Sequence, residues 1–465
     1  MYKKGAGGVR MRGNDCLNNH PYIPFNQLKE RQDCPYICRL APGKCSFAFE
    51  WLDPCDGKHT LYYRLRNGDE THTMDLCNRK ETVTGLLQDT EYEFYVENAL
   101  GKKSNVRIVR TGDVPEGATV INYLHPDDDQ YAFSGHYLCS PSLVRVGSGR
   151  LIAGMDVYGP QMAQNLSILF YSDDEGKNWS YLNDLYPFYW GTLFYHKGKL
   201  YILGLSTEYG NLQIAYSEDE GKTWSAPTVI LYGSSVLCAN GGMHRAPMQL
   251  VTYNHRLYTT CEYGCWEKKS HLPAILSIHE DDDLMTASNW TCSTFLQYEG
   301  EWKEQTHIQG DTMEGNIVIK DGVFYDYLRW SIGKALILKY DPTELEKELE
   351  YVTLSDMPVS NSMFRILEQD GEYFLITNRQ TEEAKKFEYW SYRNVLSIFR
   401  SKDLVHWELC RDIINHETCD AAKEGFQYPT VLLEDNHLLT VVRSAFNQAN
   451  SAHNSNYMLF WNMEL

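Results

Sequence analysis

The sequence lacks the long hydrophobic runs that cross a membrane. Its 465 residues contain no uninterrupted apolar stretch of about 18, the length that a spanning helix needs. The first residues, Met1 to Gly5, include two lysines, but no apolar segment follows them, so we expect no signal peptide. The sequence therefore predicts a protein with no membrane partner and a cytoplasmic location, or a secreted one if a leader peptide has been removed.

Positive charge is also scarce. Lysine and arginine number 43 against 62 aspartates and glutamates, which gives a formal net charge of −19. Nucleic-acid binding needs a positive footprint, and anionic membranes attract basic segments, so the charge balance argues against both partners. A local group of arginines can still bind an anionic sugar on an acidic protein.

Cysteine motifs and a serine nucleophile motif are missing as well. The 13 cysteines are irregularly spaced, and no close Cys-x-x-Cys pair suggests a zinc site or a disulfide framework. We therefore expect reduced thiols, no bound metal and no cofactor. Serine, histidine and aspartate are scattered without a nucleophile elbow, which argues against a serine hydrolase.

Aromatic residues are plentiful, at 13% of the chain. β-Sheets favour tyrosine and tryptophan, and sugar-binding surfaces use the same rings. Short alternating segments separated by turns run through the chain, and residues 344–350 are the one stretch for which we expect a helix. The predicted fold class is all-β.

Two segments precede the larger part of the chain. Residues 1–35 have no periodicity and are expected to form an N-terminal arm. Residues 36–113 contain four alternating segments that predict a small β-sandwich. The four segments are residues 47–51, 61–65, 92–96 and 106–109.

One motif in the predicted sandwich resembles a known module. Leu86, Thr90 and Tyr92 have the spacing of the E–F corner of fibronectin type III modules, although Gln88 stands where those modules usually have proline. The resemblance implies a fibronectin type III-like β-sandwich over residues 36–113.

The remaining residues, 114–465, repeat one unit of two apolar strands joined by a short turn. Six such hairpins, spaced tens of residues apart, predict a six-bladed β-propeller. The hairpins cover residues 143–153, 192–203, 249–258, 317–325, 364–376 and 430–441.

Two turns match the Asp-box pattern Ser-x-Asp-x-Gly-x-Thr-Trp. Residues 217–224 match it fully, residues 172–179 match it with Asn178 in place of threonine, and residues 401–407 form a degenerate copy. The aspartate accepts backbone N–H groups within the turn, and the glycine supplies a positive φ. With these turns, the chain from about residue 131 onward resembles the sialidase superfamily of Asp-box, or BNR-repeat, β-propellers.

The resemblance implies an active site. Sialidases hold the carboxylate of their substrate with three arginines and attack with a tyrosine that a glutamate deprotonates, because a neutral phenol is not repelled by that carboxylate. By position in the family's order, Tyr428 would be the nucleophile and Glu314 its base. Arg329 and Arg393 would be two of the three carboxylate-binding arginines.

Two positions depart from the family pattern. Cys139 stands where the first arginine is expected, so the arginine triad is incomplete. The loop that should carry the acid/base aspartate has none after Asp156, which lies at the end of the preceding strand. Asp156 is therefore a candidate proton donor.

Other polar residues near predicted strand starts are candidates for the same cleft. His244 is a further candidate acid or base, because imidazole titrates near neutral pH, and Glu262 is the third candidate proton donor. The residues expected to contact substrate are Arg245, Glu262, His136 and His307.

Three functions fit these residues. The first is an exo-acting glycoside hydrolase that removes a terminal acidic sugar, sialic acid or a related one, from a glycan. The second is a polysaccharide lyase acting on uronate-linked sugars, with His136, His244 or Tyr428 as the base. The third is a non-catalytic carbohydrate-binding propeller. The oligomeric state is left open.

Overall fold

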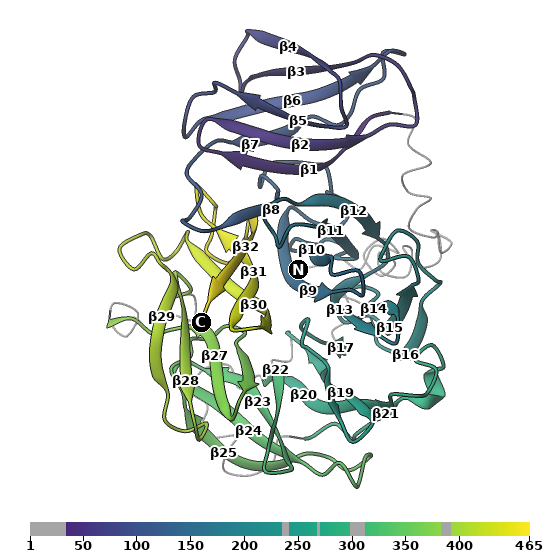
Figure 1. Ribbon diagram of the computed structural model, residues 1–465, viewed down its shortest axis with the longest axis vertical. Coiled ribbons are helices and arrows are strands. Elements are labelled where there is room, and N and C mark those ends of the chain that lie inside the picture. The colour runs from purple at the N-terminus through teal and green to yellow at the C-terminus, as the bar shows by residue number, and fades with distance from the viewer. Residues whose placement is uncertain (1–33, 235–240, 267–269, 298–311, 383–391) are drawn as a thin grey trace, which may run out of the picture.

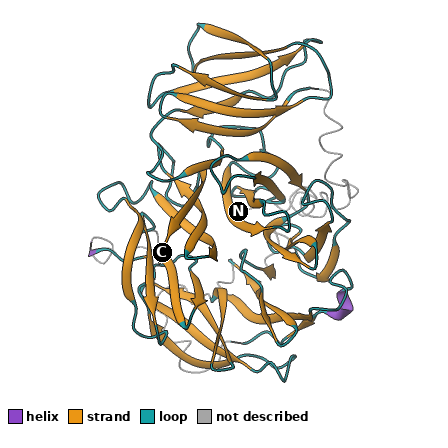
Figure 2. Cartoon of the chain, viewed as in Figure 1, coloured by secondary structure: helices purple, strands orange, loops and turns teal. Residues whose placement is uncertain are grey.

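Strands make up most of the computed structural model, which describes residues 34–234, 241–266, 270–297, 312–382 and 392–465 (Figure 2). The predicted all-β class is confirmed, with the short 3₁₀ turn η1 (Ala287–Asn289) between strands. No helix in these ranges is long and apolar enough to cross a membrane.

The helix expected over residues 344–350 is wrong. Turns occupy this segment, and the strand β25 (Glu350–Asp356) begins at its end. Lys347 forms ion pairs with Glu344 and Glu350 at 3.1 and 3.0 Å, and Leu349 is buried in a hydrophobic cluster. A helix this short is marginal by itself, and the turns that replace it bury Leu349.

Two sheets are built from the N-terminal part of the described chain (Figure 1). One has the order β1 (Tyr36–Gly43), β2 (Ser46–Leu52), β5 (Lys80–Thr84). The other has the order β4 (Thr71–Leu76), β3 (His59–Leu65), β6 (Glu91–Asn98), β7 (Arg107–Arg110). The four predicted strands of this region are confirmed. Both sheets contribute to one hydrophobic core, in which the Phe94 ring lies 4.6 Å from that of Phe47 and 5.6 Å from that of Phe49.

A buried ion pair joins these sheets to the rest of the molecule. Arg107 on β7 donates from Nε to Asp128 at 2.6 Å and from Nη1 to the carbonyl oxygen of Ile37 at 2.9 Å. Both charged side chains are fully buried. Because a charge left alone in such a place would be costly, the pair holds the two parts of the chain together.

Six further sheets follow one another around a common centre (Figure 1). The first is β9 (Tyr137–Arg145), β10 (Leu151–Tyr158), β11 (Leu166–Ser172), β12 (Ser180–Leu185). The second is β13 (Tyr189–His196), β14 (Lys199–Leu205), β15 (Leu212–Ser217), β16 (Thr228–Leu231). The third is β17 (Gly242–His244), β18 (Val251–Tyr253), β19 (Arg256–Cys265), β20 (Ser270–His279), β21 (Thr291–Cys292).

The other three sheets complete the circuit. The fourth is β22 (Met313–Lys320), β23 (Val323–Ser331), β24 (Lys334–Tyr340), β25. The fifth is β26 (Arg365–Gln369), β27 (Glu372–Asn378), β28 (Val395–Ser401), β29 (Glu408–Asn415). The sixth is β30 (Gly425–Glu434), β31 (His437–Ala445), β32 (Tyr457–Glu464), completed by β8 (Thr119–Tyr123). The six predicted hairpins are confirmed as antiparallel pairs, and β8 joins the start of this region to its end.

The turns at residues 172–179 and 217–224 share one hydrogen-bond pattern. In the first, Ser172 Oγ accepts from the N–H of Gly176 at 2.9 Å and Asp174 accepts from the N–H of Asn178 at 2.8 Å. Gly221 and Thr223 donate in the same way to Ser217 and Asp219 of the second turn. Each turn packs on the preceding sheet of the circuit, the first against Phe460 of β32 and the second against Leu182 of β12.

Gly176 offers a test of this packing. It has a φ of +82°, and a Cβ added there would lie 2.0 Å from Cε1 of Phe460. We expect Gly176→Ala to reduce the free energy of unfolding by about 2 to 3 kcal/mol, because the positive φ costs about 1 kcal/mol and overpacking costs at least as much again. Thermal unfolding of the purified variant measures the loss.

The matched control is Gly198→Ala. Gly198 has the same φ of +82°, but nothing lies within 4 Å of an added Cβ. This variant should lose only about 1 kcal/mol, the cost of the left-handed backbone. Equal losses in the two variants would contradict a role for the contact with Phe460.

Candidate functional site

Four strands that face the centre carry the same backbone irregularity. In β9, β13, β22 and β30, two residues oppose one on the neighbouring strand, and the first of the two has a positive φ. These residues are Ser140 (φ 49°), Trp190 (51°), Glu314 (62°) and Tyr428 (57°). A β-bulge re-aims a side chain, and a left-handed non-glycine residue costs about 1 to 3 kcal/mol, so such positions are characteristic of functional sites.

Tyr428 and Glu314 meet through their side chains. The Tyr428 hydroxyl donates to Glu314 Oε1 at 2.6 Å and accepts from Arg329 Nη1 at 2.9 Å. The same Nη1 also donates to Glu314 Oε2 at 2.9 Å. Three residues from β22, β23 and β30, up to 114 positions apart in the chain, thus form one hydrogen-bonded group.

Two more arginines lie over the ring of Tyr428. The Cζ atom of Arg443 is 4.8 Å from the ring centroid, and that of Arg393 is 5.7 Å away. Burial raises the pKa of the Tyr428 hydroxyl, as does Glu314, while Arg329, Arg393 and Arg443 act in the opposite direction. The phenol is therefore neutral near pH 7, with an acceptor for its proton already in contact.

Arg443 was not among the residues predicted to bind substrate, although the sequence carries a signal for it. Arg329 follows Glu314 by fifteen residues, and Arg443 follows Tyr428 by the same number. In each hairpin the arginine pairs with the residue just before the bulge, Met313 in one and Gln427 in the other. The two arginines are thus at equivalent positions of two different sheets.

Arg443 also acts electrostatically on Cys139. Burial raises the pKa of the Cys139 thiol to about 12, Asp156 adds to the rise, and Arg443 opposes it. Arg443 Nη2 donates to the carbonyl oxygen of His453 at 2.6 Å, and its buried Nε has no acceptor among the described residues.

A cavity of about 270 Å³ opens next to this group. Tyr428, Glu314 and Arg443 line it, whereas Arg329 and Arg393 do not. The remaining side chains of the lining are mostly aromatic or hydrogen-bonding, as is usual for small-molecule sites. They include Tyr158, Gln164, Tyr189, Trp190, Glu208, His244, Trp266, His453 and Asn454.

His244 and Glu262 form a second polar pair at the cavity. His244 lines the cavity, and its Nδ1 lies 3.0 Å from Glu262 Oε2. Glu262 Oε1 accepts from the backbone N–H of Glu314 at 2.8 Å, so the pair is linked to the bulge of β22. Burial raises the pKa of Glu262 to about 7.

Asp156, Arg245 and His136 are further predicted site residues that do not line the cavity. Asp156 is buried, bonded to the Ser167 hydroxyl and the Trp190 N–H, and burial raises its pKa to about 8. Arg245 is buried and donates to Thr192, Thr259 and two carbonyl oxygens. His136 contacts the carbonyl oxygen of Asp128 at 3.2 Å. His307 lies outside the described residues.

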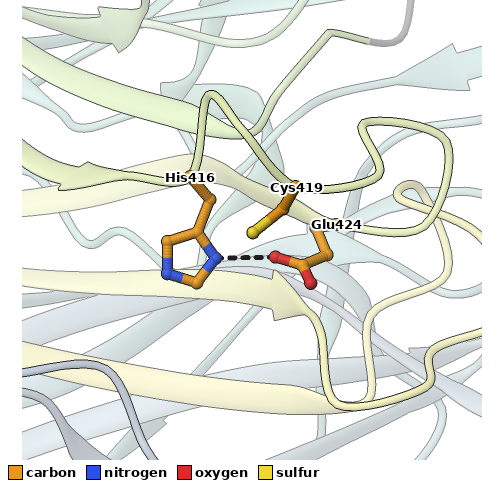
Figure 3. A group of neighbouring side chains, drawn as sticks. All are labelled: His416, Cys419 and Glu424. Atoms are coloured by element: carbon orange, nitrogen blue, oxygen red, sulfur yellow. Dashed lines mark hydrogen bonds and ion pairs between the residues drawn. The ribbon is translucent and has the colours of Figure 1, made fainter.

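One group of potential metal ligands was found in the described part of the chain, away from the cavity lining. His416, Cys419 and Glu424 lie on the loop before β30, with ligand atoms within 4.8 Å of one another (Figure 3). His416 Nδ1 is 2.6 Å from Glu424 Oε2. Burial raises the pKa of the Cys419 thiol, and Glu424 adds to the rise.

One family model matches more than half of the chain. The family model described as "BNR repeat-like domain" matches residues 193–441. No curated protein matches the chain in sequence.

Several solved structures are similar at low identity. The Hadza microbial sialidase Hz136 is 11% identical, with a TM-score of 0.49 and 95% of each chain covered. NanB sialidase from Streptococcus pneumoniae is 11% identical, with a TM-score of 0.49, and 93% of this chain and 94% of that chain are covered. An α-L-arabinanase of Penicillium chrysogenum, complexed with arabinobiose, is 12% identical, with a TM-score of 0.48, and 75% of this chain and 98% of that chain are covered.

Proposed function

This chain belongs to the BNR repeat-like domain family, and from that premise we propose that it is an exo-acting glycoside hydrolase that removes a terminal acidic sugar, sialic acid or a related one, from glycans. Residues 114–465 would form a six-bladed, sialidase-like β-propeller whose blades are the six sheets around the centre. The observation that carries the proposal is the contact of the Tyr428 hydroxyl with Glu314 Oε1 at 2.6 Å.

Residues 36–113 would be a fibronectin type III-like β-sandwich in front of the propeller. The sheets of three and four strands with a common core support this assignment. So does the corner tyrosine, since the Tyr92 hydroxyl accepts a hydrogen bond from the N–H of Leu87 at 2.9 Å.

The proposed chemistry starts at Tyr428. Its oxygen attacks the anomeric carbon as its proton passes to Glu314, so a phenol that is neutral near pH 7 becomes nucleophilic only as the bond forms. Arg329 donates to the Tyr428 oxygen and to Glu314 Oε2, so it stabilises the negative charge that moves from the carboxylate to the phenol oxygen and back. The left-handed backbone at Glu314 and Tyr428 supports this role, because it aims both side chains at one point.

An acidic sugar fits the charge of the site. Arg443 lines the cavity with a buried Nε that has no acceptor in the described part of the chain, and an unsatisfied buried donor costs about 1 to 3 kcal/mol. A carboxylate is a suitable partner, because guanidinium groups bind it with strong, charge-assisted hydrogen bonds. Arg443 would thus supply the third arginine that is missing at Cys139.

A polysaccharide lyase is the second candidate, and the His244–Glu262 pair favours it. A histidine held by a carboxylate at a cavity wall is a suitable general base for removing the proton next to a uronate carboxylate. The arginines would neutralise that carboxylate in the same way.

A glycan panel tests both candidates. Purified protein is incubated with oligosaccharides that end in sialic acids or uronic acids, and products are followed by reducing-end and ultraviolet detection. Release of the terminal acidic sugar without new ultraviolet absorbance is the expected result. An unsaturated, ultraviolet-absorbing product would identify a lyase, and binding without any product would identify a non-catalytic carbohydrate-binding protein.

A further inference from the structure

Glu208 is a carboxyl group at the cavity that the sequence did not single out. It lies between β14 and β15 and belongs to the same lining as Tyr428 and Glu314. Its Oε1 accepts from Trp266 Nε1 at 3.0 Å, and its Oε2 accepts from Gln164 Nε2 at 2.7 Å. Both donors also line the cavity, so the carboxyl is fixed at the wall by its own neighbours.

The surroundings of Glu208 differ from those of Glu314. Glu314 forms an ion pair with Arg329 at 2.9 Å, whereas no cationic side chain in the described ranges forms an ion pair with Glu208. Burial raises the pKa of Glu208, and the hydrogen bonds from Trp266 and Gln164 offset this only in part. Two carboxyl groups at one cavity, one beside a cation and one beside neutral donors, are suited to opposite proton-transfer roles.

The other candidate proton donors are committed to other contacts. Asp156 is bonded to Ser167 and to the backbone of Trp190, and it does not line the cavity. Glu262 bonds to His244 and to the backbone of Glu314, and it does not line the cavity either. His244 does line the cavity, so it is the remaining competitor.

We propose that Glu208 is the general acid/base of this site, the group that protonates the departing sugar oxygen; this rests on the proposed glycosidase function. In the first step the bond from Tyr428 oxygen to the anomeric carbon forms, and the glycosidic carbon–oxygen bond breaks. The leaving oxygen takes the Glu208 proton, and the phenol proton goes to Glu314.

The second step returns both protons. Water adds to the anomeric carbon and gives one proton to the Glu208 carboxylate, while the bond to Tyr428 breaks and its oxygen regains the proton held by Glu314. The acidic sugar leaves with the hydroxyl of that water. Gln164 and Trp266 would act as positioning residues that hold the carboxyl at the wall between the two steps.

The test compares Glu208→Gln with the wild type on two substrates. One substrate is a natural glycan, whose departing alcohol needs a proton, and the other is an aryl glycoside of the same sugar, whose phenol leaves without one. In Glu208→Gln we expect kcat on the glycan to fall by about 100-fold. The rate constant of the bond-cleavage step in the aryl glycoside should fall by less than about 5-fold. Pre-steady-state release of the phenol measures the cleavage step.

Three outcomes overturn the assignment. Equal losses on both substrates would make Glu208 a structural residue, and no loss on either would remove it from the reaction. The selective loss appearing in His244→Gln instead would transfer the role to His244. A wild-type protein that cleaves neither substrate would instead overturn the proposed glycosidase function, and this proposal with it.

Glu218→Gln is the matched control on the same sheet. Glu218 is on the surface next to β15, where it pairs with Lys199 at 2.7 Å, and its side chain is 66% exposed. This variant should retain wild-type rates on both substrates. Melting temperatures of both variants within a few degrees of the wild type would confirm that the carboxamide is tolerated.

Discussion

Tyr428→Phe should reduce turnover by at least about 10³-fold while sugar affinity changes by no more than a few-fold. The substitution removes the only protein atom that the proposed mechanism uses as a nucleophile, and loss of such a group costs several orders of magnitude in kcat. The ring remains beneath Arg393 and Arg443, so the shape of the cavity and its charge are retained. Single-turnover assays and calorimetric titration with the product sugar separate the two effects.

The hydroxyl can be removed here without leaving a charge alone, because Glu314 and Arg329 still pair with each other at 2.9 Å. Tyr195→Phe is the control, since this tyrosine is 36% exposed and lies on the surface of another sheet. Activity of Tyr428→Phe near the wild-type level would contradict the nucleophile assignment. A parallel loss of binding would indicate that the hydroxyl holds the sugar rather than attacking it.

The parts of the site that could be predicted from sequence lie in the repeated hairpins. Strand periodicity predicted the hairpins, and the resemblance to the sialidase superfamily singled out Glu314, Arg329 and Tyr428. In the structure these three residues lie on two of the hairpins, next to their bulges. The turns at residues 172–179 and 217–224 could also be predicted, because the hydrogen bonds of each turn come from its own serine, aspartate and glycine.

The parts that could not be predicted depend on backbone direction and on loops. The bulges give tyrosine and glutamate a left-handed backbone, which the propensities of these residues do not predict. Asp156 is an example. It pairs with Cys139 and so has the same hairpin position as Arg329 and Arg443. Its carboxyl nevertheless bonds to Ser167 and to the backbone of Trp190 and does not line the cavity.

Glu208 was missed for a different reason. Glu208 bonds to Gln164, which is 44 residues away in the sequence, and to Trp266, which is 58 residues away. No sequence motif includes any of these three positions. Loops carry much of the function of a rigid scaffold, while their side-chain contacts are set by tertiary structure rather than by local pattern.

Arg443→Met should weaken binding of an acidic sugar by about 2 to 4 kcal/mol, roughly 30- to 1000-fold, because it removes a charged partner from a desolvated carboxylate. Methionine keeps much of the apolar stem of Arg443 and removes the guanidinium, whose Cζ lies over the rings of Tyr428 and Tyr158. The control ligand is the same sugar with its carboxylate converted to an amide. The wild type and Arg443→Met should bind this amide with affinities that differ by less than about 3-fold, because the amide has no charge for Arg443 to pair with. Calorimetric titration with both ligands measures the difference.

Two further variants show whether the loss comes from charge or from geometry. Arg443→Lys keeps the charge but not the two parallel N–H donors of the guanidinium group. Its affinity for the acidic sugar should therefore lie between those of the wild type and Arg443→Met. Arg400→Met is the surface control, because Arg400 is 52% exposed in its ion pair with Glu408. Equal losses for the acidic sugar and its amide would mean that Arg443 only supports the cavity wall. The carboxylate would then have to bind through Arg329 and Arg393, which are not among the lining residues. If Arg329→Met and Arg393→Met also weakened binding of the acidic sugar and its amide equally, the substrate would be a neutral sugar.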